Sequence, residues 1–443
     1  MNIDVGLMAI ILIGIMLLLM ATGMPVAFAL ISMSVAGFCI LRGPDTIYAL
    51  SSVTFTTITK DIFVALPTFI FMATVLEMSG LGSAMYEMMY KWFAGLRGGL
   101  AMGTIAISSI MAAMTGSPAT ATLTMGVLAY PEMEKRGYDR TMIIGCIPAG
   151  GVLGPLIPPS VPMIVVASVS FVSIGKLFIA GIIPGVITAI AFMAYIGIRC
   201  FFKPAMGPPV PKVERANWSE KLRSLRNSFL PILLIFLVLG LIYLGVATPS
   251  EAGGIGAFGS LLCAAIYRNL TFRNVQRAAR SALRITAMVL WLLVAGNMFS
   301  QLLGIAGVQA YTQEMVLGLQ VSPWAVVIAI LVIVFILGMF IDATPITVIF
   351  LPIFFPIVDA LGFDPLWFTF IFTMDILIGL ITPPFGMVLF FFKGLNIPGV
   401  TMMDIFKSIY PYVAIMTVVL ILVVLVPELA VWLPNQMITN PGG

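Results

Sequence analysis

The stretch "GLITPPFGM", residues 379–387, places two adjacent prolines and two glycines inside an otherwise apolar run. A second stretch, "GPLIPPSVPM" (154–163), has the same character earlier in the chain. Proline removes a helical hydrogen bond, and lipid offers no partner for the backbone groups that are then exposed. Each stretch therefore predicts a spanning helix that is broken where protein or a water-filled cavity surrounds the break.

The rest of the chain is unusually apolar. Of its 443 residues 61% are hydrophobic and only 9% are charged, and the mean hydropathy is +1.14. A soluble domain carries about 25% charged residues. The apolar runs are ~18–22 residues long, the length of a spanning helix rather than of a barrel strand. We expect an all-α polytopic membrane protein.

Matched glycines and prolines reveal an internal repeat. Residues of the first half align without a gap to residues 225 positions later, the separation of Pro131 from Pro356. The matched pairs are Gly82 and Gly307, Pro131 and Pro356, Gly137 and Gly362, Asp139 and Asp364, Gly154 and Gly379, Pro158 and Pro383, and Pro159 and Pro384. Because glycine and proline report backbone shape, the matches indicate two copies of one unit. We predict a first repeat over 1–200, a linker over 201–228 and a second repeat over 229–443.

Charge orients the two copies. The linker is rich in lysine and arginine, which marks it as cytoplasmic by the positive-inside rule. In the first repeat, the loops flanking 98–135 carry Arg97, Lys135, Arg136 and Arg140. The equivalent loops of the second repeat have no lysine or arginine, and their only charges are Glu314, Asp359 and Asp364. Opposite orientation of two similar halves is an inverted-topology repeat, which is typical of secondary transporters.

Each copy then predicts a re-entrant helical hairpin and a broken helix. The hairpins should cover about 98–135 and about 323–358, with tips at "TGSPAT" and "IDATP", and Ser117 aligns with Asp342. The broken helices should cover about 140–172 and about 366–392. Entering from opposite sides, the two tips should meet near the membrane midplane.

The broken segments suit a small cation and an anion. Free carbonyls with serine and threonine hydroxyls form an oxygen cage for an alkali cation, and half-helix N-termini, each worth about +0.5 charge, can hold a carboxylate. Asp342 is the best candidate cation ligand, since a membrane-buried acid is costly. Asp375 could be a second ligand, a protonatable group or a packing residue. Glu77 is interpreted as structural.

Two further segments have simpler interpretations. Glu251 should cap a helix that begins near Thr248, because Thr-Pro-Ser-Glu is a helix-start pattern. The basic segment 267–284 has arginines at helical spacing, which predicts an amphipathic helix on the cytoplasmic surface.

Several stretches resemble the large membrane subunit of tripartite ATP-independent periplasmic (TRAP) transporters. They are "GMPVAFAL" (23–30), "GSPATAT" (116–122), "KRGYD" (135–139), "GPLIPPSVPM", "TPSEAGG" (248–254), "GMFIDATP" (338–345) and "GLITPPFGM". The resemblance implies an elevator-type secondary transporter of the ion transporter superfamily in the bacterial inner membrane. It also implies a small membrane subunit, a periplasmic substrate-binding protein that delivers an organic acid such as a C4-dicarboxylate, and Na⁺ as coupling ion.

The resemblance also implies the site residues. The expected cation ligands are Ser117, Gly154, Pro155, Pro158, Asp342, Thr344, Gly379, Thr382 and Pro383, and Asp375 is added to them as a membrane-buried acid rather than from the resemblance. The expected contacts of the cargo are Ser117, Thr120, Pro159, Ser160, Thr344 and Pro384. The chain departs from the family pattern in two places: no aspartate follows Ser117, and Asp375 stands where asparagine is common. These departures suggest altered cation stoichiometry or partial proton coupling.

Other functional classes fit less well. An enzyme is disfavoured because the chain has no histidine, no nucleophile elbow and no clustered carboxylates. No Walker motif is present, so ATP does not drive this chain, and no long basic tract suggests nucleic acid. A channel needs broken helices but not paired inverted hairpins. A stand-alone ion-coupled carboxylate carrier of the same superfamily remains the alternative. C4-dicarboxylates, sialic acids, sugar acids and sulfonates all remain open as cargo.

Overall fold

The computed structural model describes residues 5–79, 81–115, 117–319 and 321–438, and the regular elements within them are helices. Gly116, the first residue of "GSPATAT", lies outside the described residues. The first half contains α1 (Val5–Ala21), α2 (Val26–Arg42), η1 (Pro44–Thr46), α3 (Ile47–Ile58), η2 (Asp61–Val64), α4 (Ala65–Met78), α5 (Leu81–Phe93), α6 (Gly99–Thr115), α7 (Pro118–Lys135), α8 (Arg140–Leu156), α9 (Val161–Ser170) and α10 (Ile174–Phe202). After η3 (Pro204–Met206) and η4 (Lys212–Glu214), the second half contains α11 (Trp218–Tyr243), α12 (Pro249–Ile266), α13 (Phe272–Ile305), α14 (Val308–Gly318), α15 (Pro323–Phe340), α16 (Ala343–Ala360), α17 (Pro365–Gly379), α18 (Met387–Lys393), α19 (Met402–Leu425) and α20 (Glu428–Asn435).

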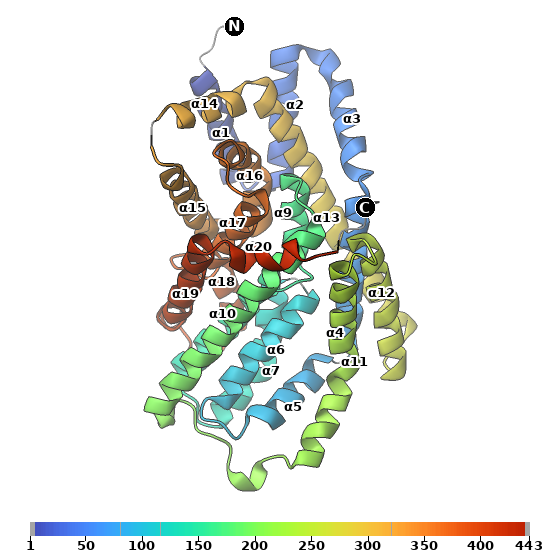
Figure 1. The fold of residues 1–443 in the computed structure, drawn as a ribbon, viewed down its shortest axis with the longest axis vertical. Coiled ribbons are helices and arrows are strands. Elements are labelled where there is room, and N and C mark those ends of the chain that lie inside the picture. Colours follow the sequence, from blue (N-terminus) through green and yellow to red (C-terminus); the bar gives the residue numbers. More distant parts are fainter. Residues whose placement is uncertain (1–4, 80, 116, 320, 439–443) are drawn as a thin grey trace.

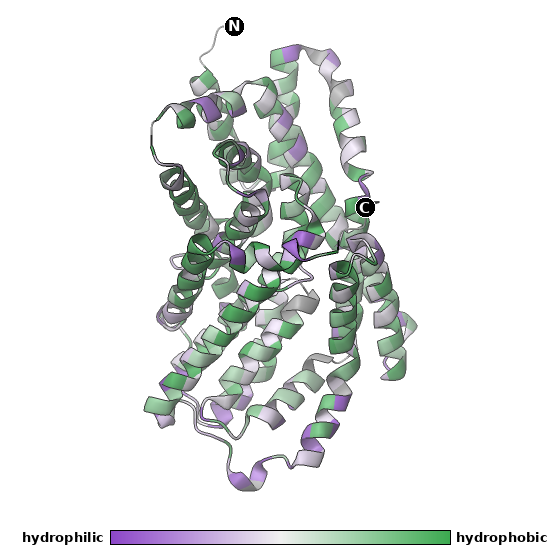
Figure 2. Ribbon diagram, viewed as in Figure 1, coloured by the Kyte–Doolittle hydropathy of each residue, from purple (hydrophilic) through white to green (hydrophobic). Residues whose placement is uncertain are grey.

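Length and hydropathy make this a multi-pass membrane protein. Six segments of the described residues are long and apolar enough to cross a bilayer: Asp61–Met78, α10, α13, α15, α16 and α19. Two bent pairs, α8 with α9 (42°) and the two parts of α11 (51°), bring the number to eight if each is one span. Figure 2 shows apolar helices with hydrophilic residues gathered at the lower end, around the linker. The expected all-helical, multi-span membrane protein is confirmed.

Helix bounds recur along the chain at the spacing found in the sequence. Helix α7 spans residues 118–135 and α16 spans 343–360, so both ends are shifted by 225. Helices α8 and α17 begin at residues 140 and 365, with the same shift. Figure 1 places α6 and α7 in the lower half of the view and α15 and α16 in the upper half. The two helix pairs therefore occupy different halves of the molecule.

The equivalent of α13 in the first half is broken. Residues 47–78 form α3, η2 and α4, whereas α13 is one helix of 34 residues. The basic segment 267–284 was expected to form an amphipathic helix on the cytoplasmic surface. Arg273, Arg277, Arg280 and Arg284 are helical and exposed, but they lie in the first turns of α13, which continues into its apolar part without a break.

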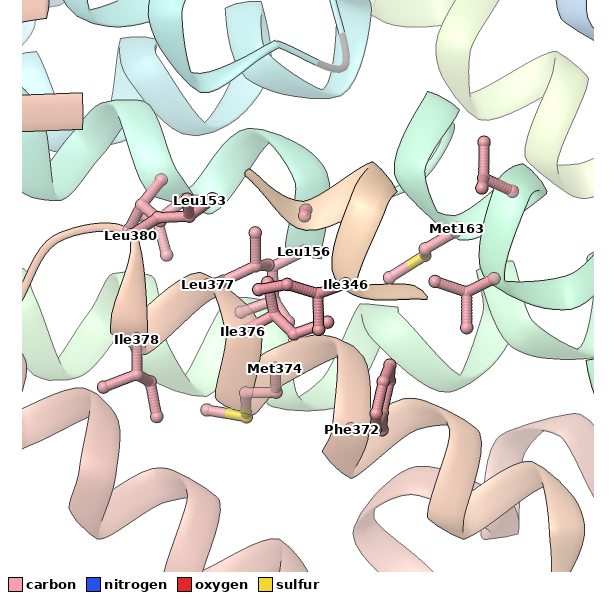
Figure 3. Packing of buried hydrophobic residues seen from close by; sticks show 14 of the residues in the cluster. Leu153, Leu156, Met163, Ile346, Phe372, Met374, Ile376, Leu377, Ile378 and Leu380 are labelled. Carbon is pink, nitrogen blue, oxygen red and sulfur yellow. The ribbon is translucent and has the colours of Figure 1, made fainter. Parts of the chain in front are cut away.

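The centre of the fold is formed by α8 and α17. Nearly every residue of both helices is buried, as expected for helices that are apolar on all sides. Small residues of α8, among them Gly150 and Gly151, allow neighbouring helices to come close. Figure 3 shows Leu156 of α8 and Ile346 of α16 close to Leu377 of α17, so the two halves share one core.

The linker contacts both the residue that precedes α6 and the residue that follows α7. The Gly98 N–H donates to the Gly207 carbonyl (2.8 Å), and the Asp139 N–H donates to the Met206 carbonyl (3.0 Å). Arg136 forms an ion pair with Glu214 (3.0 Å). Residues just before α6 and just after α7 are therefore at the same end of the molecule, and α6–α7 is a hairpin.

The second half has an aromatic cluster at the corresponding place. The Trp324 ring, in the first turn of α15, lies 5.0 Å from Phe363 and 5.8 Å from Trp367, between ring centroids. Phe363 precedes α17, so the start of α15 and the segment after α16 are also adjacent. Helices α15 and α16 therefore form the second hairpin.

Candidate functional site

Each hairpin turns at a residue that caps the helix after the turn. Ser117 is the N-cap of α7, and its hydroxyl accepts from the Thr120 N–H (3.3 Å). Asp342 is the N-cap of α16, and its carboxylate accepts from the Ala343 N–H (2.9 Å). Serine and aspartate are preferred caps because their oxygens satisfy N–H groups that lack an intrahelical partner. Both turns thus present a helix N-terminus with its partial positive charge.

The proline pairs lie in the two breaks. Helix α8 ends at Leu156 and α9 begins at Val161, with Pro158–Pro159 as a cis peptide bond between them. Ser160 caps α9 and donates its hydroxyl to the Pro155 carbonyl (2.7 Å). Helix α9 thereby keeps a fixed position relative to the end of α8.

The second break is longer and is held by the neighbouring hairpin. Helix α17 ends at Gly379 and α18 begins at Met387, and Pro383–Pro384 is also cis. Gly386 adopts a left-handed conformation (φ 58°) and donates its N–H to the Met339 carbonyl of α15 (2.9 Å). The Thr382 hydroxyl donates to the Ile378 carbonyl (2.7 Å).

Glycines let each broken helix approach its own hairpin. A Cβ on Gly151 would collide with the Thr122 hydroxyl and lie 3.0 Å from the Pro118 carbonyl oxygen of α7. A Cβ on Gly379 would lie 2.7 Å from the Gly338 backbone of α15. These close crossings fix the distance between each hairpin and its broken helix.

A cavity of about 270 Å³ joins the two hairpin turns, the first break and two helices from outside the hairpins. Its lining from the turns is Ser117, Pro118, Thr120, Asp342, Ala343 and Thr344. The core helices contribute Pro155, Val161, Pro162, Leu377 and Leu380. The wall formed by α4 and α13 contributes Ile70, Ala73, Thr74, Glu77, Ser281, Ile285, Met288 and Val289. The volume lies just below the range of about 300–1,000 Å³ that is typical of small-molecule sites, so the cavity is limited to a small solute.

The structure places the expected site residues in several surroundings. Those that line the cavity are Ser117, Thr120, Pro155, Asp342 and Thr344. Those found instead in or next to the breaks, without lining it, are Gly154, Pro159, Ser160, Gly379, Thr382, Pro383 and Pro384. Pro158 borders a separate apolar cavity of about 530 Å³ between α10 and α11. The turn residues are thus brought together, and the break residues surround them.

Asp375 is buried in α17 with 3% of its surface exposed, and it does not line the cavity. Its Oδ2 atom has no hydrogen-bond partner in the described part of the chain. An unpaired buried carboxylate is costly, so Asp375 needs a proton or a cation to neutralise it. This environment fits the ligand and protonatable alternatives better than a hydrogen-bonded packing role.

Sequence reasoning missed the contribution of the α4 wall. Glu77 was interpreted as structural, yet it lines the cavity from the last turn of α4. Thr74 lies one turn earlier and also lines it. The polar residues at 74 and 77 share one helix face at an i, i+3 spacing, a signal that could have identified this face.

The cavity has two carboxylates and no described cationic lining residue. Glu77 comes from the α4 wall and Asp342 from the second turn. Positive potential comes instead from the N-terminal turns of α7 and α16. Chemically, such a cavity can hold a cation beside carboxylate and hydroxyl oxygens and an anion at helix N-termini.

An all-helical membrane protein in which two hairpin turns line one cavity, mostly apolar but with two carboxylates and several hydroxyls, has the architecture of a membrane permease. In fold it is similar to the YdaH transporter of Alcanivorax borkumensis, with a TM-score of 0.64 over 92% of this chain and 97% of that one, at 14% identity. Residues 13–429 match the family model described as tripartite ATP-independent periplasmic transporter, DctM component. The chain belongs to this family of TRAP transporter large permeases.

Relatives of several named specificities span nearly the whole chain. The C4-dicarboxylate TRAP transporter large permease DctM of Pseudomonas aeruginosa is 30% identical over 399 residues, covering 90% of this chain and 92% of its own. The ectoine large permease TeaC of Halomonas elongata is 29% identical, covering 96% and 99%. The 2,3-diketo-L-gulonate large permease YiaN of Escherichia coli is 30% identical, covering 83% and 85%. Membership of a tripartite system implies a small permease and a periplasmic binding protein as partners.

Proposed function

We propose that the chain is the permease subunit of a cation-coupled secondary transporter that imports an organic acid, with Na⁺ as coupling ion. The cavity into which both hairpin turns project carries this proposal. It places helix N-termini, hydroxyls and Asp342 around one space, which are the groups that a carboxylate and an alkali cation require.

Two copies of opposite orientation would explain how the cavity reaches both sides of the membrane. The basic loops around the first hairpin lie beside the cytoplasmic linker, as the Arg136–Glu214 ion pair illustrates. The loops of the second hairpin lack lysine and arginine and cluster around Trp324. By the positive-inside rule, this charge difference supports an inverted repeat with the hairpins entering from opposite sides.

In the proposed mechanism, the hairpins and broken helices move as one body against the α4 and α13 wall, as in an elevator. The close glycine crossings tie each hairpin to its own broken helix, and the equally close crossing of Gly296 in α13 with Val348 of α16 is a contact that this movement would have to change. The coupling cation would bind at Asp342 and Thr344, with a second candidate position near Ser117. The cargo carboxylate would lie at the N-termini of α7, α9 and α16.

The partners follow from the same proposal. A periplasmic binding protein would deliver the acid, and a small membrane subunit would bind the permease in the bacterial inner membrane. Relatives with different named cargoes share the permease architecture, which supports selectivity residing largely in the binding protein.

Membrane topology gives the first test. Lys135→Cys and Asp359→Cys, each in a cysteine-free chain, are labelled in intact cells with a membrane-impermeant maleimide. We expect Asp359→Cys to react from the periplasm and Lys135→Cys only after permeabilisation. Labelling of both positions from the same side would contradict the inverted repeat.

Transport gives the second test. The ligand of the cognate binding protein is first identified by a thermal-shift screen, and its uptake is then measured in proteoliposomes with and without a sodium gradient. We expect sodium-driven accumulation that requires the binding protein and the small subunit. Accumulation without the binding protein would instead indicate a stand-alone carrier, and equilibration without any ion gradient would indicate a channel.

A further inference from the structure

The α4 wall places a charge directly in the proposed transport path. Glu77 lines the same cavity as Asp342 but from a helix outside the hairpins. The cavity volume is only about 270 Å³, so any cargo that fills it must come close to both carboxylates. The charge on the cargo therefore has to be compatible with Glu77.

Among the described residues, nothing positive next to Glu77 compensates the charge of its carboxylate. It lies in the last turn of α4, where unpaired carbonyls carry the negative end of the helix dipole and favour a cation. No ion pair involves Glu77 within the ranges that the structure describes. The Thr74 hydroxyl donates to the Ile70 carbonyl (2.8 Å), so towards the cavity its oxygen can act only as an acceptor.

The arginines of α13 are close in sequence to the lining residues of that helix, but they do not line the cavity. Ser281 and Ile285 line it, whereas Arg277, Arg280 and Arg284 on the same helix are exposed and do not. The charge of these exposed arginines is screened by solvent and salt, and none of them forms a described ion pair with Glu77.

The charges of the cargo, the coupling cation and the two carboxylates can now be added up, on the basis of the proposed function. The coupling cation would neutralise Asp342, and helix N-termini at the turns would hold one cargo carboxylate. Glu77 then remains with a negative charge. A second cargo carboxylate would add repulsion there, whereas a cationic nitrogen would be attracted. We propose that Glu77 is a specificity-determining residue that favours a zwitterionic solute, with one carboxylate and one cationic nitrogen group, over a dicarboxylate.

The effect of the Glu77 charge on the cavity is tested without measuring transport. Ser281→Cys in a cysteine-free chain is a reporter on the cavity wall, and its reaction rates with a cationic (trimethylammonioethyl) and an anionic (sulfonatoethyl) methanethiosulfonate are compared. We expect the cationic reagent to be favoured and the rate ratio to fall about fourfold or more with Glu77→Gln, for a unit charge ~10 Å away in water. Glu428→Gln is the matched control, because Glu428 is exposed on α20 and also lacks a described ion pair.

An unchanged ratio in Glu77→Gln would overturn the proposal, as would an equal fall in Glu428→Gln. Met288→Cys, also on the wall, repeats the measurement if the first reporter fails to fold. Failure of either reporter to react with both reagents would show that the cavity is closed to solutes of this size, which also contradicts the proposal.

The cargo part is tested by protection of the same reporter in sodium buffer. Glycine betaine, ectoine and alanine are compared with succinate and malate as solutes that slow modification. We expect at least one zwitterion to protect at lower concentration than either dicarboxylate, and Glu77→Gln to reverse the order. Stronger protection by succinate with Glu77 present, or no protection by any zwitterion, would overturn the proposal. Sodium-driven uptake of a dicarboxylate would in that case leave the proposed transport function intact.

Discussion

Asp342→Asn separates two roles of one side chain. Asp342 caps α16 through the Ala343 N–H and also offers a carboxylate to the cavity. Asparagine is as good a cap as aspartate, so the hydrogen bond can be kept while the charge is removed. The lost charge at the helix N-terminus should lower the free energy of unfolding by only about 0.3–1 kcal/mol.

The effect on cation binding should be larger. Two unit charges 4 Å apart attract by about 1 kcal/mol in water and about 4 kcal/mol at the dielectric of a protein surface. Asp342 is exposed to the cavity, so the lower part of this range applies. A loss of about 1–2 kcal/mol corresponds to a sodium affinity that is roughly five- to thirtyfold weaker.

The assay is a sodium titration of the thermal unfolding temperature of the purified permease complex, with choline keeping the ionic strength constant. Asp364→Asn is the matched control, because Asp364 caps α17 through the Trp367 N–H (2.8 Å) outside the cavity. Both variants should lose similar stability without sodium, and only Asp342→Asn should shift the sodium midpoint. A midpoint within twofold of the unmodified chain would refute a cation site at Asp342.

Three further substitutions test the fold and the buried acid. Gly379→Ala puts a Cβ 2.7 Å from the Gly338 backbone and should lower the free energy of unfolding by about 1–3 kcal/mol. Gly254→Ala is the control, because its Cβ meets nothing within 4 Å, and it should stabilise its helix by up to about 1 kcal/mol. Equal shifts in the unfolding temperature of the two variants would contradict this prediction. Asp375→Asn removes a buried ionisable group whose Oδ2 atom has no described partner, and it should alter the sodium or pH dependence of uptake; unchanged dependence on both would exclude a coupling role. Thr248→Ala breaks the capping box of α12 and should cost about 0.5–2 kcal/mol, measured by thermal unfolding, with uptake per folded molecule unchanged; an unaltered unfolding temperature would show that the cap contributes nothing.

Residues that dictate backbone shape made much of the architecture predictable. Proline restricts the chain locally and glycine permits conformations that other residues disfavour, so the breaks near Pro158 and Pro383 could be located without knowing any tertiary contact. The cap at Glu251 was equally local, and the capping box with Thr248 confirms it. Hydropathy likewise identifies spanning helices because the bilayer imposes their length.

What depends on how helices face one another could not be predicted. Whether Glu77 meets the cavity or the lipid depends on the rotation of α4 against α13, and the spacing of Thr74 and Glu77 marks a polar face without saying what that face meets. The same limit applies to Pro158, which borders a different cavity from Pro155 although both lie at one break. The start of α13 shows the same limit, because the spacing of its arginines predicts a helix but not that this helix continues into an apolar span.

The two copies share the helix-capping pair Asp139 and Asp364, but not the three acids in or near the cavity. At the shift of 225, Asp342 corresponds to Ser117, and Glu77 corresponds to Leu302, which is fully buried against the α2 residue Gly37. Asp375 corresponds to Gly150, where a Cβ would already lie 2.6 Å from Ser108 and no acid could fit. Each acid therefore occurs in one copy only, so a cation site at the first turn would have to rely on neutral oxygens. Because neutral oxygens bind a cation less strongly than a carboxylate does, the two proposed cation positions should differ in affinity, with the site at Asp342 filling first.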